Sequence, residues 1–241
     1  MIKDLSSGNP DDPGIQAAAR MALAMVRDGG KVGLGSGRAS TAFITALGAR
    51  VKEGLRVHGV VTSARSEKLA RELGIPLIEL EEDVELDLIV DGADEVAPNL
   101  DLIKGWGGAL VRERIVTCAS RRQIILVGEA KLVQTLGERG RIPVEIIPLA
   151  KGYASRQLRV LGLRPTLRLN SDGTPIISDN RNLTLDCALL QPLRDGTAAR
   201  RLETRILKIA GVVDTGMFLG TADQVLVGHK DGTVEALRRG K

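Results

Sequence analysis

Apolar residues in the first half of the chain recur with two spacings, which predict helices and strands in alternation. Apolar positions three or four residues apart are typical of amphipathic helices, and short continuous apolar runs are typical of buried strands. The predicted helices are Ile15–Arg27, Ser40–Val51, Ser66–Leu73 and Ala109–Ser120. The predicted strands are Lys31–Leu34, Arg56–Val61, Pro76–Glu79, Leu86–Val90 and Gln123–Val127. Because such alternation builds parallel sheets covered on both faces, we expect an α/β fold with a doubly wound, mostly parallel, Rossmann-like sheet.

The pattern changes after Pro143, where strands and helices no longer alternate regularly. Here the spacing predicts helices over 155–161 and 198–210 and strands over 165–169, 175–178, 183–187 and 212–218. Two last strands, at 224–228 and 233–237, are expected to return to the first sheet. We therefore predict a Rossmann-like catalytic domain over 1–131 and 219–241, interrupted by a smaller α+β domain at 132–218 that supplies a contact between subunits.

Composition is that of an ordinary globular protein. Of the 241 residues, 43% are hydrophobic and 27% charged, and no apolar run approaches the length of a membrane span. The polar residues 1–14 lack the basic and then apolar layout of a signal peptide. Cys118 and Cys187 each lie in a segment that is predicted to be buried, which favours small apolar packing over a disulfide. We therefore expect a cytoplasmic protein with no membrane partner.

A formal charge of +4 would attract either nucleic acid or a small anion. Aromatic residues make up 2% of the chain, which is too few to stack several bases. The basic side chains of the predicted helix at 198–210 are typical of a solvated face. An anionic metabolite is therefore favoured, and no nucleic-acid partner is expected.

The glycine-rich segment 33–41 follows the first predicted strand, at the edge where doubly wound sheets bind ligands. Its backbone N–H groups, the hydroxyls of Ser36 and Ser40 and the guanidinium of Arg38 suit a phosphate group. A dinucleotide fingerprint would have glycine at position 38 and an acidic residue after the next strand, and the chain has neither. NAD is therefore disfavoured, whereas a phosphate site and a turn without a ligand both stay open.

Three carboxylates, Asp91, Asp94 and Glu95, follow the predicted strand Leu86–Val90. A divalent metal site, acid–base chemistry and a solvated turn all fit this segment. No histidine joins the cluster in sequence, and His58 and His229 are expected to be surface or half-buried residues rather than metal ligands.

A lysine and a glutamate flank the glycine-rich segment 105–108. Lys104 precedes the glycines and could hold a developing oxyanion, and Glu113 falls in the first turns of the next helix, where it could move a proton between neighbouring carbons. Taken alone, the same pair also fits ordinary surface charges near a helix start.

These segments, in this order, resemble the ribose-5-phosphate isomerase A family over nearly the whole chain. The matching motifs are Val32–Gly37, Thr62-Ser63, Leu73–Leu77, Asp91–Glu95, Lys104-Gly105, Arg112-Glu113, Pro143–Glu145 and Asp179-Asn180. The resemblance implies an aldose–ketose isomerase that interconverts ribose 5-phosphate and ribulose 5-phosphate through an enediolate, in the non-oxidative pentose phosphate pathway. It also implies that no metal or organic cofactor is used and that the protein is a homodimer or a homotetramer.

The resemblance extends to individual site residues. Glu113 matches the glutamate that moves the proton between C1 and C2. Asp91, Asp94 and Lys104 match residues that stabilise the enediolate, assist ring opening and transfer protons among the oxygens, and Lys131 matches a lysine that reaches the substrate. The substrate's phosphate would then bind at Gly35, Ser36, Gly37, Arg38 and Ala39.

Three positions depart from the family pattern. The family commonly has Gly-Thr-Gly-Ser-Thr where this chain has Gly35–Ala39, and a lysine often found on the first helix is replaced near Ile15. We hypothesise that Arg38 supplies the missing positive charge. Trp106 stands where the family usually has glycine, and packing over its loop is favoured over a contact with the sugar.

Two other kinds of protein use a related sheet. A sugar-phosphate sensor of a transcription regulator could dispense with a base and an oxyanion-binding lysine, whereas this chain has Glu113 and Lys104. An acyl-CoA transferase would use a glutamate as a nucleophile. The match over the whole chain favours the isomerase over both.

Overall fold

A computed structural model describes residues 12–191 and 193–239, so the polar residues 1–11 lie outside the described part of the chain. The protein consists of two compact units. The first contains the chain up to Asp94, Arg112–Lys131 and the chain from Ala222 onward, and the second contains Glu95–Val111 and Leu132–Thr221. The sequence-based boundaries placed 95–111 with the larger domain. In the structure these residues carry two short strands that pair within the second unit.

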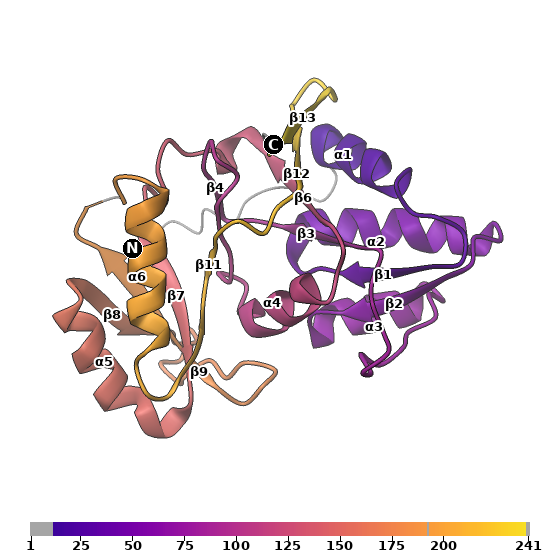
Figure 1. Ribbon diagram of the computed structural model, residues 1–241. Helices are drawn as coiled ribbons and strands as arrows, with labels where there is room; N and C mark the ends of the chain where they lie inside the picture. The colour runs from indigo at the N-terminus through magenta and orange to yellow at the C-terminus, as the bar shows by residue number, and fades with distance from the viewer. Residues whose placement is uncertain (1–11, 192, 240–241) are drawn as a thin grey trace. The chain divides into compact units, whose positions relative to one another are not determined.

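The first unit is built on a six-stranded sheet with the order β13-β12-β6-β3-β1-β2 (Figure 1). Its strands are β1 (Gly30–Leu34), β2 (Val57–Val61), β3 (Leu88–Gly92), β6 (Gln123–Gly128), β12 (Gln224–Gly228) and β13 (Val234–Arg238). Neighbouring strands are parallel except for the hairpin of β12 and β13, which is antiparallel. The predicted fold class, a doubly wound and mostly parallel sheet, is confirmed.

Helices cover both faces of this sheet, as the packing of β3 shows: its alternate side chains belong to different cores. The helices are α1 (Pro13–Leu23), α2 (Gly37–Lys52), α3 (Ala64–Glu72) and α4 (Leu110–Cys118). Leu88 and Val90 pack with residues of α1, α2 and α3. Ile89 points to the opposite face, where it packs with Val116 of α4. A strand buried on both faces has a continuous apolar sequence, as Leu86–Val90 does.

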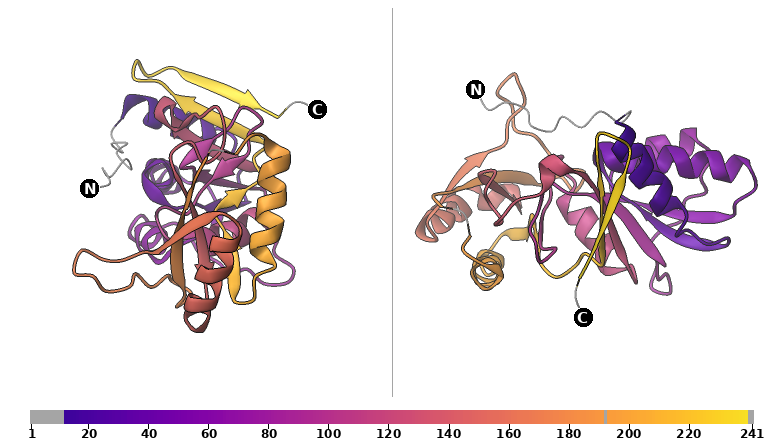
Figure 2. Two further views of the ribbon diagram at one scale, coloured as in Figure 1. Left: turned by 90° about the vertical axis from the view of Figure 1, so that its left-hand side faces the viewer. Right: turned by 90° about the horizontal axis from the view of Figure 1, so that it is seen from above.

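The start of α1 lies directly against the end of β12, and the two elements run side by side (Figure 2). A Cβ atom on Gly228 would lie 2.3 Å from the carbonyl carbon of Gly14, so this approach requires glycine. Asp12 caps the helix by accepting hydrogen bonds from the backbone N–H groups of Gly14 and Ile15.

The second unit contains two antiparallel sheets. The larger has the order β10-β7-β9-β8 and the smaller has the order β11-β5-β4. The strands are β4 (Glu95–Val96), β5 (Leu102–Ile103), β7 (Arg141–Ile146), β8 (Leu163–Leu167), β9 (Leu183–Leu189), β10 (Val212–Thr215) and β11 (Met217–Phe218). The helices α5 (Lys151–Val160) and α6 (Gly196–Leu207) pack on the larger sheet through buried residues such as Leu158 and Ile206. Short 3₁₀ helices occupy Glu129–Lys131, in the first unit, and Pro148–Ala150, in the second.

Three predicted strands differ in the structure. The segments 76–79 and 175–178 form only isolated bridges, at Leu77 in the first and at Pro175 and Ile177 in the second. The predicted strand 212–218 is divided at Gly216 into β10 and β11, which belong to different sheets. None of the described helices is both long and apolar enough to span a bilayer.

Candidate active site

The glycine-rich loop joins β1 to α2 and presents the start of that helix. Ser36 is the N-cap residue of α2, yet its side chain makes no capping hydrogen bond. Its hydroxyl instead lies 2.6 Å from the hydroxyl of Thr62. Gly37 has φ +84°, a conformation that favours glycine. The backbone N–H groups in the first turn of α2 are therefore available to an anion, and the helix dipole favours negative charge there.

Asp91 is fully buried and holds this loop in place. Its Oδ1 accepts hydrogen bonds from the backbone N–H groups of Ser36 (2.9 Å) and Gly92 (2.8 Å). The hydroxyl of Ser40 lies 3.1 Å from the same oxygen. A Cβ atom at position 35 would lie 2.3 Å from that oxygen, so the loop can approach the carboxylate only because residue 35 is glycine. The structure thus joins the predicted phosphate loop to the first predicted catalytic carboxylate.

Ser40 and Arg38 differ in what they offer to a ligand at this loop. Ser40 is buried and lies 2.8 Å from the carbonyl oxygen of Ser36, so its hydroxyl stabilises the loop rather than facing a ligand. The Arg38 side chain is half-buried and forms no ion pair within the described part of the chain. Its charge is therefore not neutralised by a neighbouring carboxylate, and a guanidinium can form charge-assisted hydrogen bonds to a phosphate.

Asp94 and Lys131 form a second group in the first unit. Asp94 follows β3, and Lys131 lies at the end of the 3₁₀ helix that follows β6. The Lys131 Nζ is 3.9 Å from the Asp94 Oδ1, and both side chains are less than one-fifth exposed. Parallel strands β3 and β6 are neighbours, so their carboxyl ends bring these residues together.

Glu113 lies in the first turn of α4 and is 5% exposed. The positive end of the helix dipole stabilises a carboxylate at this position. A buried carboxylate fixed near a helix start has the properties needed for proton transfer, because its position is set by the backbone and water is largely excluded.

Glu95 was grouped with the aspartates in the sequence, and its side chain has a structural role. It is fully buried in the second unit, where Oε2 accepts from the backbone N–H of Gly137 (2.6 Å) and Oε1 from that of Arg139 (2.9 Å). These bonds fix a loop of that unit.

Lys104 belongs to the second unit, at the end of β5, and is 2% exposed. Its backbone N–H donates to the carbonyl oxygen of Gly216 (2.8 Å). Its ammonium lies 5.5 Å from the centre of the Phe218 ring, a distance typical of a cation–π contact. Trp106, two residues further on, is half-buried, and its ring lies 4.4 Å from the guanidinium carbon of Arg141.

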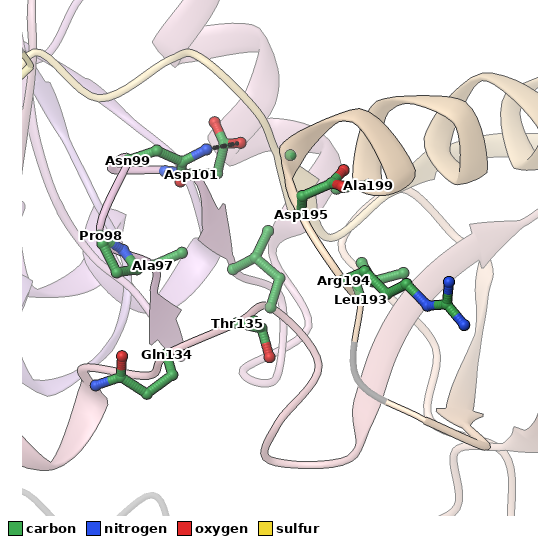
Figure 3. A pocket seen from close by; sticks show the side chains of 12 residues that line it. Ala97, Pro98, Asn99, Asp101, Gln134, Thr135, Leu193, Arg194, Asp195 and Ala199 are labelled. Carbon is green, nitrogen blue, oxygen red and sulfur yellow. Dashed lines mark hydrogen bonds between the residues drawn. The ribbon is translucent and has the colours of Figure 1, made fainter.

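The second unit also contains a pocket of about 260 Å³ that includes none of the predicted site residues (Figure 3). Its acidic groups already have partners in the protein. Asp101 accepts from the side chain of Asn99 (2.8 Å) and the backbone N–H of Gly220 (2.7 Å). Asp195 caps α6 by accepting from the N–H of Ala198 (2.8 Å). The two aspartates of the pocket are therefore already engaged within the protein.

The histidines lie apart from these groups. His58 is exposed, and the Nδ1 of His229 lies 2.7 Å from the Oε1 of Glu129. Among the residues that the structure describes, no three His, Cys, Asp or Glu side chains gather closely enough to hold a metal ion.

Taken together, the first unit is an α/β domain whose sheet carries, at the carboxyl ends of its strands, a glycine-rich loop before a helix start, two carboxylates and a lysine. With the buried Glu113, these groups are of the kind used by enzymes that act on small phosphorylated metabolites by proton transfer.

Comparison with known proteins identifies the family. The family model for ribose 5-phosphate isomerase A (phosphoriboisomerase A) matches residues 58–232. Ribose-5-phosphate isomerase A of Thermomicrobium roseum is 45% identical over 90% of each chain, and that of Deinococcus radiodurans is 44% identical over 92% of this chain and 96% of its own. The solved ribose 5-phosphate isomerase A of Methanocaldococcus jannaschii is 39% identical, with a TM-score of 0.87 over 95% of this chain and all of its own. A D-ribose-5-phosphate isomerase solved in complex with phospho-erythronic acid is 36% identical, with a TM-score of 0.87 over 93% of this chain and 97% of its own.

The chain belongs to the ribose-5-phosphate isomerase A family, and the resemblance stated from its motifs is confirmed. It is an aldose–ketose isomerase that interconverts ribose 5-phosphate and ribulose 5-phosphate.

Proposed function

We propose that Glu113 is the base of this isomerisation and that Asp91, Asp94, Lys104 and Lys131 assist it. Converting an aldose into a ketose removes a proton beside a carbonyl and returns it to the neighbouring carbon. The step needs a base beside the carbons and positive charge beside the oxygen that becomes negative. The observation that carries the proposal is the burial of Glu113 in the first turn of α4, where its carboxylate is fixed and largely shielded from water.

The other groups divide the remaining tasks by their charge. Lys104 stabilises the negative oxygen of the enediolate, since a buried ammonium is effective at low dielectric. Asp94 moves protons among the sugar oxygens during ring opening, and Lys131, whose Nζ lies 3.9 Å from the Asp94 Oδ1, reaches the substrate. Asp91 holds the phosphate loop through Oδ1, which places the loop beside the carboxylates of the same unit.

The proposed base is tested by measuring conversion of ribose 5-phosphate in EDTA. Glu113→Gln removes the base with little change in volume, and should lower kcat by roughly 10² to 10⁴ while the protein still binds the sugar phosphate. The control is Glu72→Gln, the same change at an exposed residue of α3. Parental activity in Glu113→Gln would contradict the assignment, and a parent protein that bound the sugar phosphate without converting it would favour a sensor.

Phosphate binding is proposed at Gly35, Ser36, Gly37, Arg38 and Ala39, with Arg38 in place of the lysine that the family often has on its first helix. Arg38→Ala should raise KM about tenfold, the value of one charge-assisted contact, with a smaller change in kcat. Arg50→Ala is the control, because Arg50 lies on the same helix and pairs with Glu53 instead. An unchanged KM in Arg38→Ala would contradict the hypothesis.

We also propose that the protein works as a homodimer or homotetramer in the cytoplasm, with the second unit supplying the contact. In support, that unit exposes large apolar side chains that a contact would cover, among them Leu149 (93% exposed) and Tyr153 (44%). Sedimentation of the parent and of Leu149→Lys tests this, and a parent that sediments as a monomer would refute it.

A further inference from the structure

Arg168 connects two parts of the second unit that are far apart in the sequence. It follows β8, and its backbone N–H donates to the carbonyl oxygen of Thr184 (3.0 Å). Its side chain is 9% exposed, which is unusual for arginine and requires that its donors be paired.

Asp186, on the neighbouring strand β9, fixes the plane of this guanidinium. The Nε of Arg168 donates to the Asp186 Oδ2 (2.9 Å), and Nη2 donates to Oδ1 (2.5 Å). A two-point bond between guanidinium and carboxylate sets the orientation as well as the distance. The third nitrogen, Nη1, therefore points in a fixed direction.

That direction is the loop after Lys104. The Arg168 Nη1 donates to the carbonyl oxygens of Gly105 (2.9 Å) and Trp106 (3.2 Å). Gly105 and Gly108 have φ values of +93° and +88°, and the N–H of Gly108 donates to the carbonyl of Gly105 (3.1 Å), which closes a tight turn. Glycines bring no side chain of their own to hold such a turn.

Trp106 supplies a second connection to the same carboxylate. Its ring lies 4.4 Å from the guanidinium carbon of Arg141, and the Nη1 of Arg141 lies 3.4 Å from the Asp186 Oδ2. Arg168 thus holds the loop through the carbonyl groups of Gly105 and Trp106, and Arg141 holds it through the indole ring of Trp106. Asp186 orients both arginines.

We propose that Arg168, oriented by Asp186, is a positioning residue for Lys104. The backbone N–H of Lys104 is held by its hydrogen bond to Gly216, and the turn at 105–108 follows this lysine directly. Fixing the turn fixes where the buried ammonium lies when the enediolate oxygen becomes negative. The inference depends on the role proposed above for Lys104.

The first test separates kcat from KM. Arg168→Gln keeps a polar side chain and loses the planar set of guanidinium donors. We expect kcat to fall about 10- to 100-fold and KM to change less than about threefold, because a displacement of about 1 Å of a catalytic group has effects of that size. Arg168→Lys should recover only part of the rate, since lysine cannot bind carboxylate and carbonyls with a fixed fork. Arg164→Gln, the same change at an exposed position of β8, should behave like the parent.

The second test is a double substitution. If Arg168 acts through Lys104, adding Arg168→Gln to Lys104→Gln should lower kcat by less than about twofold further, whereas independent effects would multiply. Multiplied losses, or a fully active Arg168→Gln beside an inactive Lys104→Gln, would overturn the positioning role alone. A Lys104→Gln variant at the parental rate would instead refute the proposed role of Lys104. If Arg168→Gln does not fold, Arg168→Lys replaces it, alone and in combination with Lys104→Gln.

Discussion

The approach of Gly35 to Asp91 predicts that a single methyl group at position 35 disrupts the phosphate loop. In Gly35→Ala the new Cβ would lie 2.3 Å from the Asp91 Oδ1, 2.4 Å from its Cγ and 2.6 Å from its Cα. Because the backbone atom of β3 is among these neighbours, rotating the Asp91 side chain cannot relieve the overlap. The loop must move away from the strand by about 1 Å to reach ordinary contact distances.

A movement of that size breaks the contacts that Asp91 makes with the backbone of Ser36 and the hydroxyl of Ser40. Hydrogen bonds to charged groups contribute about 1.5–3 kcal/mol each, so we expect a loss of about 3–6 kcal/mol in the free energy of unfolding. For a chain of this size that lowers Tm by at least about 6 °C. KM for ribose 5-phosphate should also rise, because the first turn of α2 is displaced.

The assay is thermal and urea unfolding of Gly35→Ala beside Gly92→Ala. Residue 92 adjoins Asp91, but a Cβ there would meet its nearest neighbour at 3.8 Å, an ordinary contact. We expect Gly92→Ala to unfold close to the parent. If Gly35→Ala did the same and kept its KM, the close packing of the loop on Asp91 would be refuted.

Three further results are expected. Gly216→Ala places a Cβ 2.3 Å from the carbonyl oxygen of Lys104 and should lower kcat more than it raises KM, as steady-state kinetics would show. Burial raises the pKa of the Cys187 thiol, whereas Cys118 is exposed, so a thiol reagent at pH 8 should modify only Cys118 until the protein unfolds. Hydrogen bonds and an ion pair with Arg56 lower the pKa of Asp28 to about 2 from 3.8. The stability it contributes is then present above about pH 4 and lost as pH falls toward 2, so Asp28→Asn and the parent should differ in urea unfolding at pH 6 and converge near pH 2.

The parallel sheet was predictable because its strands β1, β3, β6 and β12 are almost wholly buried, and a strand buried on both faces has a continuous apolar sequence. The strands β4 and β5 were missed, since two-residue strands show no periodicity. The division of 212–218 at Gly216 was also missed. Its side-chain pattern is continuous, and only the close approach of residue 216 to Lys104 shows where the chain leaves one sheet for another.

The residues of the candidate site in the first unit were predictable for a topological reason. Parallel strands end at one edge, so polar residues after β1, β3 and β6 must gather there. The partners of Lys104 were not predictable. Arg168 and Asp186 meet its loop through antiparallel pairing of β8 with β9, whose register the sequence does not specify. A buried arginine beside a glycine turn has no local signature, and only the fold identifies it.

The position of β12 has a consequence for synthesis on the ribosome. β12 pairs with β6 on one side and β13 on the other, yet the whole stretch Leu132–Thr221 is translated between β6 and β12. While that stretch emerges, β6 (Gln123–Gly128) is an uncovered edge with an apolar sequence, the kind of edge that invites pairing between nascent chains. Helix α1 is synthesised before β12, so the close packing of Gly14 against Gly228 forms only after β12 has been made. The last strands to be made therefore close the sheet, and a chaperone that shields strand edges would matter most during that interval.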